Sequence, residues 1–181
     1  MYVSPNRHLV CTVRLFSSPI VGIPYLSLIL FMTPQVTERI TQSPEETQQL
    51  GMALARVLKR GDCVALYGDL GSGKTCLTQG ICDGLGVKDY VSSPTFVLIN
   101  EYAGVGPDGM VLPIYHFDLY RLGEPDELYA LGCDDFFYGE GVCIIEWADL
   151  GGDLIPAEAI DIRLAHAGQA LRKVIISGSV L

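Results

Sequence analysis

One stretch of the sequence has the residue types and spacing that hold a nucleoside triphosphate. It fits the pattern G-x-x-x-x-G-K-[ST] at every fixed position, and its residues are Gly68, Asp69, Leu70, Gly71, Ser72, Gly73, Lys74 and Thr75. The glycines allow backbone conformations that turn successive N–H groups toward phosphate oxygens. Lys74 is expected to reach the β and γ phosphates, and the Thr75 hydroxyl to ligate magnesium. The stretch therefore predicts a P-loop that binds ATP and Mg2+, with Cys76 next to it in the nucleotide site.

An apolar run that ends on a carboxylate supplies the second acid that such a site requires. Residues Val142–Ile145 are all apolar and predict a buried strand, and Glu146 follows at its end. We therefore expect Glu146 to hold Mg2+, directly or through water. The alternative is an ordinary surface acid at the end of a strand. Trp147 comes next; it either packs in the core or shields the site, and packing is the simpler interpretation.

A dense polar cluster, residues 116–121, follows another apolar run. Asp118 lies two positions from His116, so both side chains point to one side of a continuing strand. Asp118 is a candidate for the metal shell or for orienting the attacking water; the alternative is a carboxylate that caps the next turn. His116 is expected to be a structural histidine. Arg121 either stabilises phosphate charge or pairs with a surface acid.

The loop at residues 92–96 lies between the expected P-loop helix and the next strand. It carries the hydroxyl residues Ser92, Ser93 and Thr95 around Pro94. A hydroxyl at this place can sense the γ-phosphate and magnesium, as switch loops do. From its residues alone, a plain Ser/Pro loop is the simpler interpretation.

The spacing of apolar residues and turn signals predicts an α/β fold. Ser43, Pro44 and Glu46 form a helix start, and this helix is expected to end at Gly61. The P-loop opens a helix over residues 75–85, and another is expected over residues 125–131. Strands are expected at residues 63–67, 96–102, 110–117, 142–145, 159–165 and 171–177. This order predicts a single-domain P-loop NTPase-like sheet flanked by helices.

Composition and charge narrow the classes of function. Hydrophobic residues make up 49% of the 181 residues and charged residues 18%, which excludes a disordered chain. The net charge of −9 argues against a direct grip on RNA, because such affinity comes from many Lys and Arg side chains. Any nucleic acid is therefore expected to be handled by a partner. The cysteines form no C-x-x-C pair and predict buried thiols in a reducing, cytoplasmic compartment; they are Cys11, Cys63, Cys76, Cys82, Cys133 and Cys143.

The first 31 residues differ from the rest of the chain. They contain no acidic residue, and their most apolar part, Ile20–Met32, is interrupted by Gly22 and Pro24, which makes it too short and broken to span a membrane. We interpret residues 1–31 as a disordered N-terminal extension produced by a misassigned start, with Met32 as the first residue of the protein. A secretion signal and an organellar transit peptide are the alternatives. Residues 32–181 are expected to form the ATPase domain.

Together these motifs resemble those of one family, the bacterial TsaE (YjeE) ATPases of tRNA threonylcarbamoyladenosine biosynthesis. The resemblance covers Ser43–Leu164 and follows the family order. It is carried by Gly68–Thr75, Ser93–Phe96, Asn100–Tyr102, His116–Leu122 and Ile145–Trp147. Two departures are the N-terminal extension and the residues after Trp147, where the family commonly has Pro and Glu.

The resemblance implies a magnesium-dependent ATPase with weak activity of its own. It also implies work with the TsaB–TsaD complex, which places a threonylcarbamoyl group on adenosine 37 of tRNA. In this sequence Lys74 would bind the phosphates, and Thr75 and Glu146 would hold the metal. Thr95 would belong to the switch loop and Asp118 would be essential to hydrolysis. Thr47 would lie near the nucleotide base.

Two other functions remain open. A small-molecule P-loop kinase usually carries a lid with clustered arginines, whereas Arg121 is the only arginine between the P-loop and Glu146. A nucleotide-gated interaction protein would bind ATP and barely turn it over. Measuring ATP hydrolysis alone, with the partner complex and with metabolite acceptors separates these functions.

Overall fold

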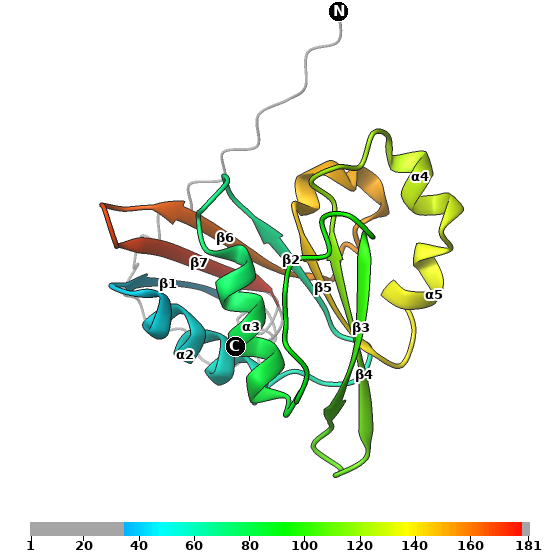
Figure 1. The fold of residues 1–181 in the computed structure, drawn as a ribbon, viewed down its shortest axis with the longest axis horizontal. Coiled ribbons are helices and arrows are strands. Elements are labelled where there is room, and N and C mark those ends of the chain that lie inside the picture. The colour runs from blue at the N-terminus through cyan, green and yellow to red at the C-terminus, as the bar shows by residue number, and fades with distance from the viewer. Residues whose placement is uncertain (1–34, 179–181) are drawn as a thin grey trace, which may run out of the picture. The chain divides into compact units, whose positions relative to one another are not determined.

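A seven-stranded mixed sheet forms the centre of the protein (Figure 1). The computed structural model describes residues 35–178, so the predicted extension 1–31 and its boundary at Met32 lie outside the described residues. The strands are arranged in the order β1-β7-β6-β2-β5-β4-β3. Their bounds are β1 Gln35–Thr41, β2 Cys63–Tyr67, β3 Ile99–Val105, β4 Val111–Asp118, β5 Val142–Glu146, β6 Ile160–His166 and β7 Arg172–Gly178.

Four neighbouring strands of this sheet run parallel. β2 pairs in parallel with both β5 and β6, and β5 pairs in parallel with β4. The outer strands β1, β3 and β7 join by antiparallel pairing. Parallel strands end at the same edge of a sheet, and in open α/β sheets ligands bind at that carboxyl edge. The segments that follow β2, β4 and β5 therefore meet in one place.

Helices cover the two faces of the sheet. They are α2 Pro44–Ala55, α3 Lys74–Gly84, α4 Pro125–Ala130 and α5 Cys133–Phe137, with short 3-10 turns at Ala148–Leu150 and Gly152–Leu154. Along β5, Val142 and Ile144 pack in one apolar cluster with α2 and α3. Cys143 and Ile145 pack in a second cluster with α4 and α5. The predicted α/β sheet flanked by helices is confirmed by this arrangement (Figure 1).

The helix start at Ser43 is confirmed, whereas the predicted end at Gly61 is wrong. The Ser43 side chain accepts a hydrogen bond from the Glu46 backbone N–H, and Pro44 occupies the first turn. The helix ends at Ala55 because the chain tightens there: the Val57 N–H bonds to the Leu54 carbonyl, three residues back. Such a short bond closes the last turn and stops the α-helical ladder.

One strand begins later than predicted, and another was not predicted. The strand expected at residues 96–102 begins only at Ile99, because the N–H groups of Val97 and Leu98 both bond to the Pro94 carbonyl and Leu98 has a φ of 67°. β1 was not predicted at all. It is an edge strand that shows Val36 and Ile40 to solvent, so its sequence lacks the apolar alternation by which buried strands are found. Among residues 35–178, no helix has the length and apolar character needed to cross a membrane.

Candidate functional site

The predicted P-loop forms the turn between β2 and α3, and its glycines are required by the backbone. Gly68, Gly71 and Gly73 have φ values of 138°, 74° and 103°, conformations that side chains rarely tolerate. A Cβ on Gly68 would also lie 2.2 Å from the Leu164 carbonyl oxygen. α3 then begins at Lys74, so its unpaired N–H groups and the positive end of its dipole face the loop. This geometry is suited to an anion.

The Lys74 side chain folds back onto the start of the P-loop. Its Nζ donates to the Gly68 carbonyl at 2.5 Å and to the Asp69 carbonyl at 3.0 Å. The same atom lies 3.6 Å from the centroid of the Trp147 ring, a cation–π contact. Burial lowers the pKa of Lys74, and the carboxylates of Glu146 and Asp118 counteract this shift. The ammonium group is thus held inside a site that contains two acids.

Glu146 ends β5 fully buried and receives hydrogen bonds on both carboxylate oxygens. The Thr75 hydroxyl donates to Oε2 at 2.8 Å. His116 Nε2 lies 2.9 Å from Oε1, and the Thr78 hydroxyl lies 3.3 Å from the same oxygen. These contacts orient the carboxylate toward the start of α3, beside the lysine.

Asp118 ends the neighbouring strand β4 and holds the 92–96 loop. Its Oδ2 accepts hydrogen bonds from the hydroxyls of Ser93 and of Thr95, the latter at 2.7 Å. Its Oδ1 accepts from the Tyr120 backbone N–H at 3.0 Å. Asp118 pairs in register with Glu146 on β5, so the two carboxylates end adjacent strands. The alternative interpretation of Glu146 as an ordinary surface acid is wrong, because Glu146 is only 1% exposed. Asp118 is 3% exposed, and its bond to the Tyr120 N–H also caps the next turn, as its alternative interpretation predicted.

Further side chains anchor the same loop upstream of Thr95. Gln79 on α3 donates from Nε2 to the Val91 carbonyl at 3.0 Å. Asn100 on β3 donates from Nδ2 to the Ser92 carbonyl at 3.2 Å. Contacts from α3, β3 and β4 thus hold the hydroxyls of Ser93 and Thr95 in place, and a switch role of this loop stays a prediction.

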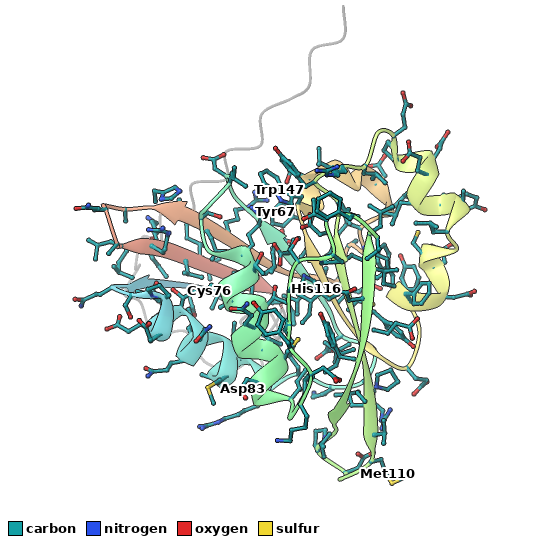
Figure 2. All side chains as sticks on the ribbon, viewed as in Figure 1. Tyr67, Cys76, Asp83, Met110, His116 and Trp147 are labelled. Carbon is teal, nitrogen blue, oxygen red and sulfur yellow. The ribbon has the colours of Figure 1, made fainter. Side chains whose placement is uncertain are left out.

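One pocket of about 310 Å3 joins these groups. It is lined by Leu70, Gly71, Gly73, Lys74, Thr75, Cys76, Ser93, Thr95, Asp118, Tyr120, Glu146 and Trp147. Gly68 and Asp69 line an adjoining pocket of about 270 Å3 that also reaches Tyr67 and Trp147. Figure 2 shows Trp147 and Tyr67 at the same end of the sheet, and Met110, in the turn after β3, at the opposite end. A larger pocket, of about 840 Å3, includes Gly61 and Asp62 before β2, and its lining contains no P-loop residue and neither Asp118 nor Glu146.

Other predicted site residues lie outside the pocket lining. Ser72 is completely buried, and its hydroxyl has no hydrogen-bond partner among the described residues. Thr47 is buried behind the loop: its methyl group lies 3.9 Å from where a Cβ on Gly73 would be. Its hydroxyl bonds to the Thr41 hydroxyl at 2.7 Å. Its contact with a nucleotide base stays a prediction. Arg121 stacks its guanidinium over the Phe96 ring at 4.3 Å.

Among the contacts that were not predicted, three come from residues outside the sequence motifs. Thr78 lies one helical turn after Lys74 and reaches Glu146, a contact that helical spacing could have indicated. Arg172 donates to the Gly71 carbonyl at 3.1 Å, and His166 Nε2 lies 3.4 Å from the Leu70 carbonyl. Both come from the closing hairpin, about a hundred residues along the chain from the loop, and no local sequence signal marks them.

The residues present fit a nucleotide with its magnesium ion. Among the described residues, no three His, Cys, Asp or Glu side chains form a group that could hold a metal. A metal beside Thr75 and Glu146 would therefore need further oxygen ligands, which nucleotide phosphates and water supply in P-loop sites. The Thr75 proton is committed to Glu146 at 2.8 Å, so the hydroxyl lone pairs remain available for a cation.

Comparisons with known proteins agree with this geometry. Residues 41–174 match the family described as threonylcarbamoyl adenosine biosynthesis protein TsaE. A tRNA threonylcarbamoyladenosine biosynthesis protein TsaE from Bacillus subtilis is 45% identical over 134 residues, 74% of this chain and 80% of that protein. A protein of the same name from Treponema pallidum is 33% identical, over 76% of this chain and 98% of its own length. The crystal structure of Bacillus subtilis YdiB has a TM-score of 0.67 at 37% identity, and covers 81% of this chain and 88% of its own.

Proposed function

The chain belongs to the TsaE family, and on that premise we propose that it is a magnesium-dependent ATPase that supports threonylcarbamoylation of adenosine 37 in tRNA. The observation that carries the proposal is the convergence of Lys74, Thr75, Asp118 and Glu146 on one pocket beside the P-loop. A lysine, a hydroxyl and two carboxylates at the carboxyl edge of parallel strands are the groups that phosphoryl transfer to water needs.

Each group has a separate task in the proposed reaction. The backbone N–H groups at the start of α3 bind phosphate oxygens. Lys74 exchanges its bonds to the Gly68 and Asp69 carbonyls for bonds to the β and γ phosphates. Thr75 and Glu146 hold Mg2+, which neutralises charge on the phosphate oxygens when bound. The Asp118 carboxylate, fixed by Ser93 and Thr95, orients the attacking water.

We further propose the TsaB–TsaD complex as the partner, with tRNA reached only through it. Two relatives carry the name tRNA threonylcarbamoyladenosine biosynthesis protein. The net charge of −9 supports an indirect role, since a direct grip on tRNA needs a basic surface. We also propose that the protein is cytoplasmic, because its cysteines form no C-x-x-C pair and are typical of a reducing compartment, and that its chemistry lies within residues 32–181.

The test is ATP hydrolysis by the purified protein in three settings: alone, with the TsaB–TsaD complex and with candidate metabolite acceptors. We expect slow release of phosphate by the protein alone and faster release with the TsaB–TsaD complex. Threonylcarbamoylated tRNA should form over repeated cycles only with active protein, and Lys74→Ala should abolish both effects. Phosphorylation of a metabolite in place of hydrolysis would show a kinase and overturn the proposal. ATP binding without hydrolysis in every setting would instead show a nucleotide-gated interaction protein.

A further inference from the structure

One buried histidine of the sheet has no task in the proposed reaction. His116 is completely buried on β4 and follows Leu112 and Ile114 on the same face of the strand. Its register partners are Asn100 on β3 and Ile144 on β5. Figure 2 marks it beside the central strands. An imidazole among apolar neighbours costs free energy unless it is hydrogen-bonded, so its single polar contact must account for its presence.

That contact is with the carboxylate proposed to hold magnesium. His116 Nε2 lies 2.9 Å from Glu146 Oε1, and Nδ1 has no partner among the described residues. An ionised carboxylate only accepts hydrogen bonds. In the proposed magnesium site the carboxylate is ionised, so Nε2 carries the ring proton and donates a hydrogen bond to Oε1. Among the described residues, Glu146 is thus the only polar partner of the ring, and the ring in return holds Oε1 of Glu146.

The other neighbour of Oε1 is a weaker donor. Thr78 has one hydroxyl proton, and its oxygen lies 3.1 Å from the Lys74 carbonyl and 3.3 Å from Glu146 Oε1. The nearer acceptor is the carbonyl of its own helix, a common bond for a threonine in a helix. His116 is therefore the principal donor to Oε1, while Oε2 is reserved for Thr75.

We propose that His116 is the positioning residue of the magnesium site: its Nε2–H holds Oε1 of Glu146 so that Oε2 faces Thr75 and the metal. The inference rests on the proposed function, because His116 contacts Glu146, which is itself only proposed to bind the metal. Partners of this kind fix the direction of a ligand, and their loss typically lowers metal affinity by about 10- to 100-fold.

A matched pair of substitutions tests the proposal. His116→Leu removes the donor at similar volume, whereas His116→Gln offers an amide N–H in the place of Nε2. The chain contains one tryptophan, Trp147, which contacts Lys74, so we expect its fluorescence to change when nucleotide binds. We expect His116→Leu to raise the Mg2+ concentration for half-maximal tightening of ATP binding about 10-fold or more, and His116→Gln to restore most of it. ATP binding in EDTA should be equal in both variants and the parent.

A second measurement needs no metal or nucleotide. Nitrogen NMR of the imidazole rings, assigned with His116→Gln, should show the proton of the buried ring on Nε2. A ring protonated only on Nδ1 would overturn the proposal, because Nε2 would then face the carboxylate with a lone pair. Melting temperatures of both variants separate positioning from folding: a purely structural histidine would lower stability and leave the Mg2+ titration unchanged.

Glu146→Gln in the same titration distinguishes a failure of the proposed magnesium site from a failure of the His116 role alone. If the parent protein shows no Mg2+-dependent binding of ATP, the proposed function and this inference both fail. If Glu146→Gln raises the Mg2+ requirement and folded His116→Leu does not, only the positioning role of His116 fails.

Discussion

Thr75 Oγ1 donates a hydrogen bond to Glu146 Oε2 at 2.8 Å, joining residues that are 71 positions apart in the chain. The bond connects the first turn of α3 to the last residue of β5. It fixes the single proton of the hydroxyl on the carboxylate, and so determines which side of each group remains free for a cation. The two side chains proposed to hold magnesium are therefore already positioned against each other.

This bond predicts opposite results for two substitutions of Thr75. Thr75→Ser keeps a hydroxyl, and the tightening of ATP binding by Mg2+ should persist. Thr75→Val keeps the shape and removes the oxygen, so the Mg2+ requirement should rise at least about tenfold, in line with the loss of one contact to a charged group. A Mg2+ titration of Trp147 fluorescence at fixed ATP measures both. Equal titrations for Val and Ser would contradict the assignment of Thr75 as a ligand.

Lys74→Ala should weaken ATP binding roughly 10- to 100-fold, the effect of losing a charge-assisted hydrogen bond of the phosphates. Titration with a fluorescent ATP analogue measures this loss. The matched control is Lys59→Ala, because Lys59 is exposed and lines a pocket remote from the P-loop. If both variants lose affinity alike, the effect is one of overall charge and the role of Lys74 at the site is refuted.

Asp118→Asn should separate binding from hydrolysis. The amide fills the same space, so ATP affinity should stay near that of the parent, while kcat falls roughly 100- to 10,000-fold, the range for removing a general base or water-orienting carboxylate. Phosphate release under saturating ATP is the measurement. Asp108→Asn, in the exposed turn between β3 and β4, is the control and should hydrolyse normally. If Asp118→Asn keeps the kcat of the parent, Asp118 does not orient the attacking water.

Much of the fold could be predicted because its signals are local. The start of α2 at Ser43, the strand before the P-loop and the strand ending in Glu146 are each specified by neighbouring residues. The late start of β3 at Ile99 depends on two N–H groups that share the Pro94 carbonyl, and the edge strand β1 depends on its pairing with β7. Such features arise from tertiary contacts, which periodicity does not encode.

In the site as well, the residues of the local motifs could be predicted, whereas the tertiary contacts could not. The motif and chain order identified Lys74, Thr75 and Glu146, and the pocket brings them together. The bonds from Ser93 and Thr95 to Asp118 could not be predicted, because they depend on how the loop folds back over β4. The contact of Arg172 with Gly71 depends on the position of β7 in the sheet. The sequence thus indicated the groups that we propose react, and only the fold showed which contacts hold them.

Alkaline pH should destabilise the protein through its buried thiols. Cys82 and Cys143 are buried in the two apolar clusters, and burial raises the pKa of each to about 12. A thiol with a raised pKa keeps its proton in the folded protein after the unfolded chain has lost it. Its stabilising contribution is therefore complete below the unfolded pKa and is lost as the pH rises through the window from about pH 9 to 12.

Cys82→Ser removes one such group without adding another that titrates in this range. The free energy of unfolding, measured with urea between pH 8 and 10.5 under reducing conditions, should fall with pH in the parent protein. In Cys82→Ser this slope should be smaller, by up to about 1.4 kcal/mol per pH unit for each thiol removed. The substitution also changes packing, which displaces the whole curve at every pH, so only the change in slope is diagnostic. Parallel curves for the parent and Cys82→Ser would show that Cys82 does not titrate differently in the folded and unfolded states.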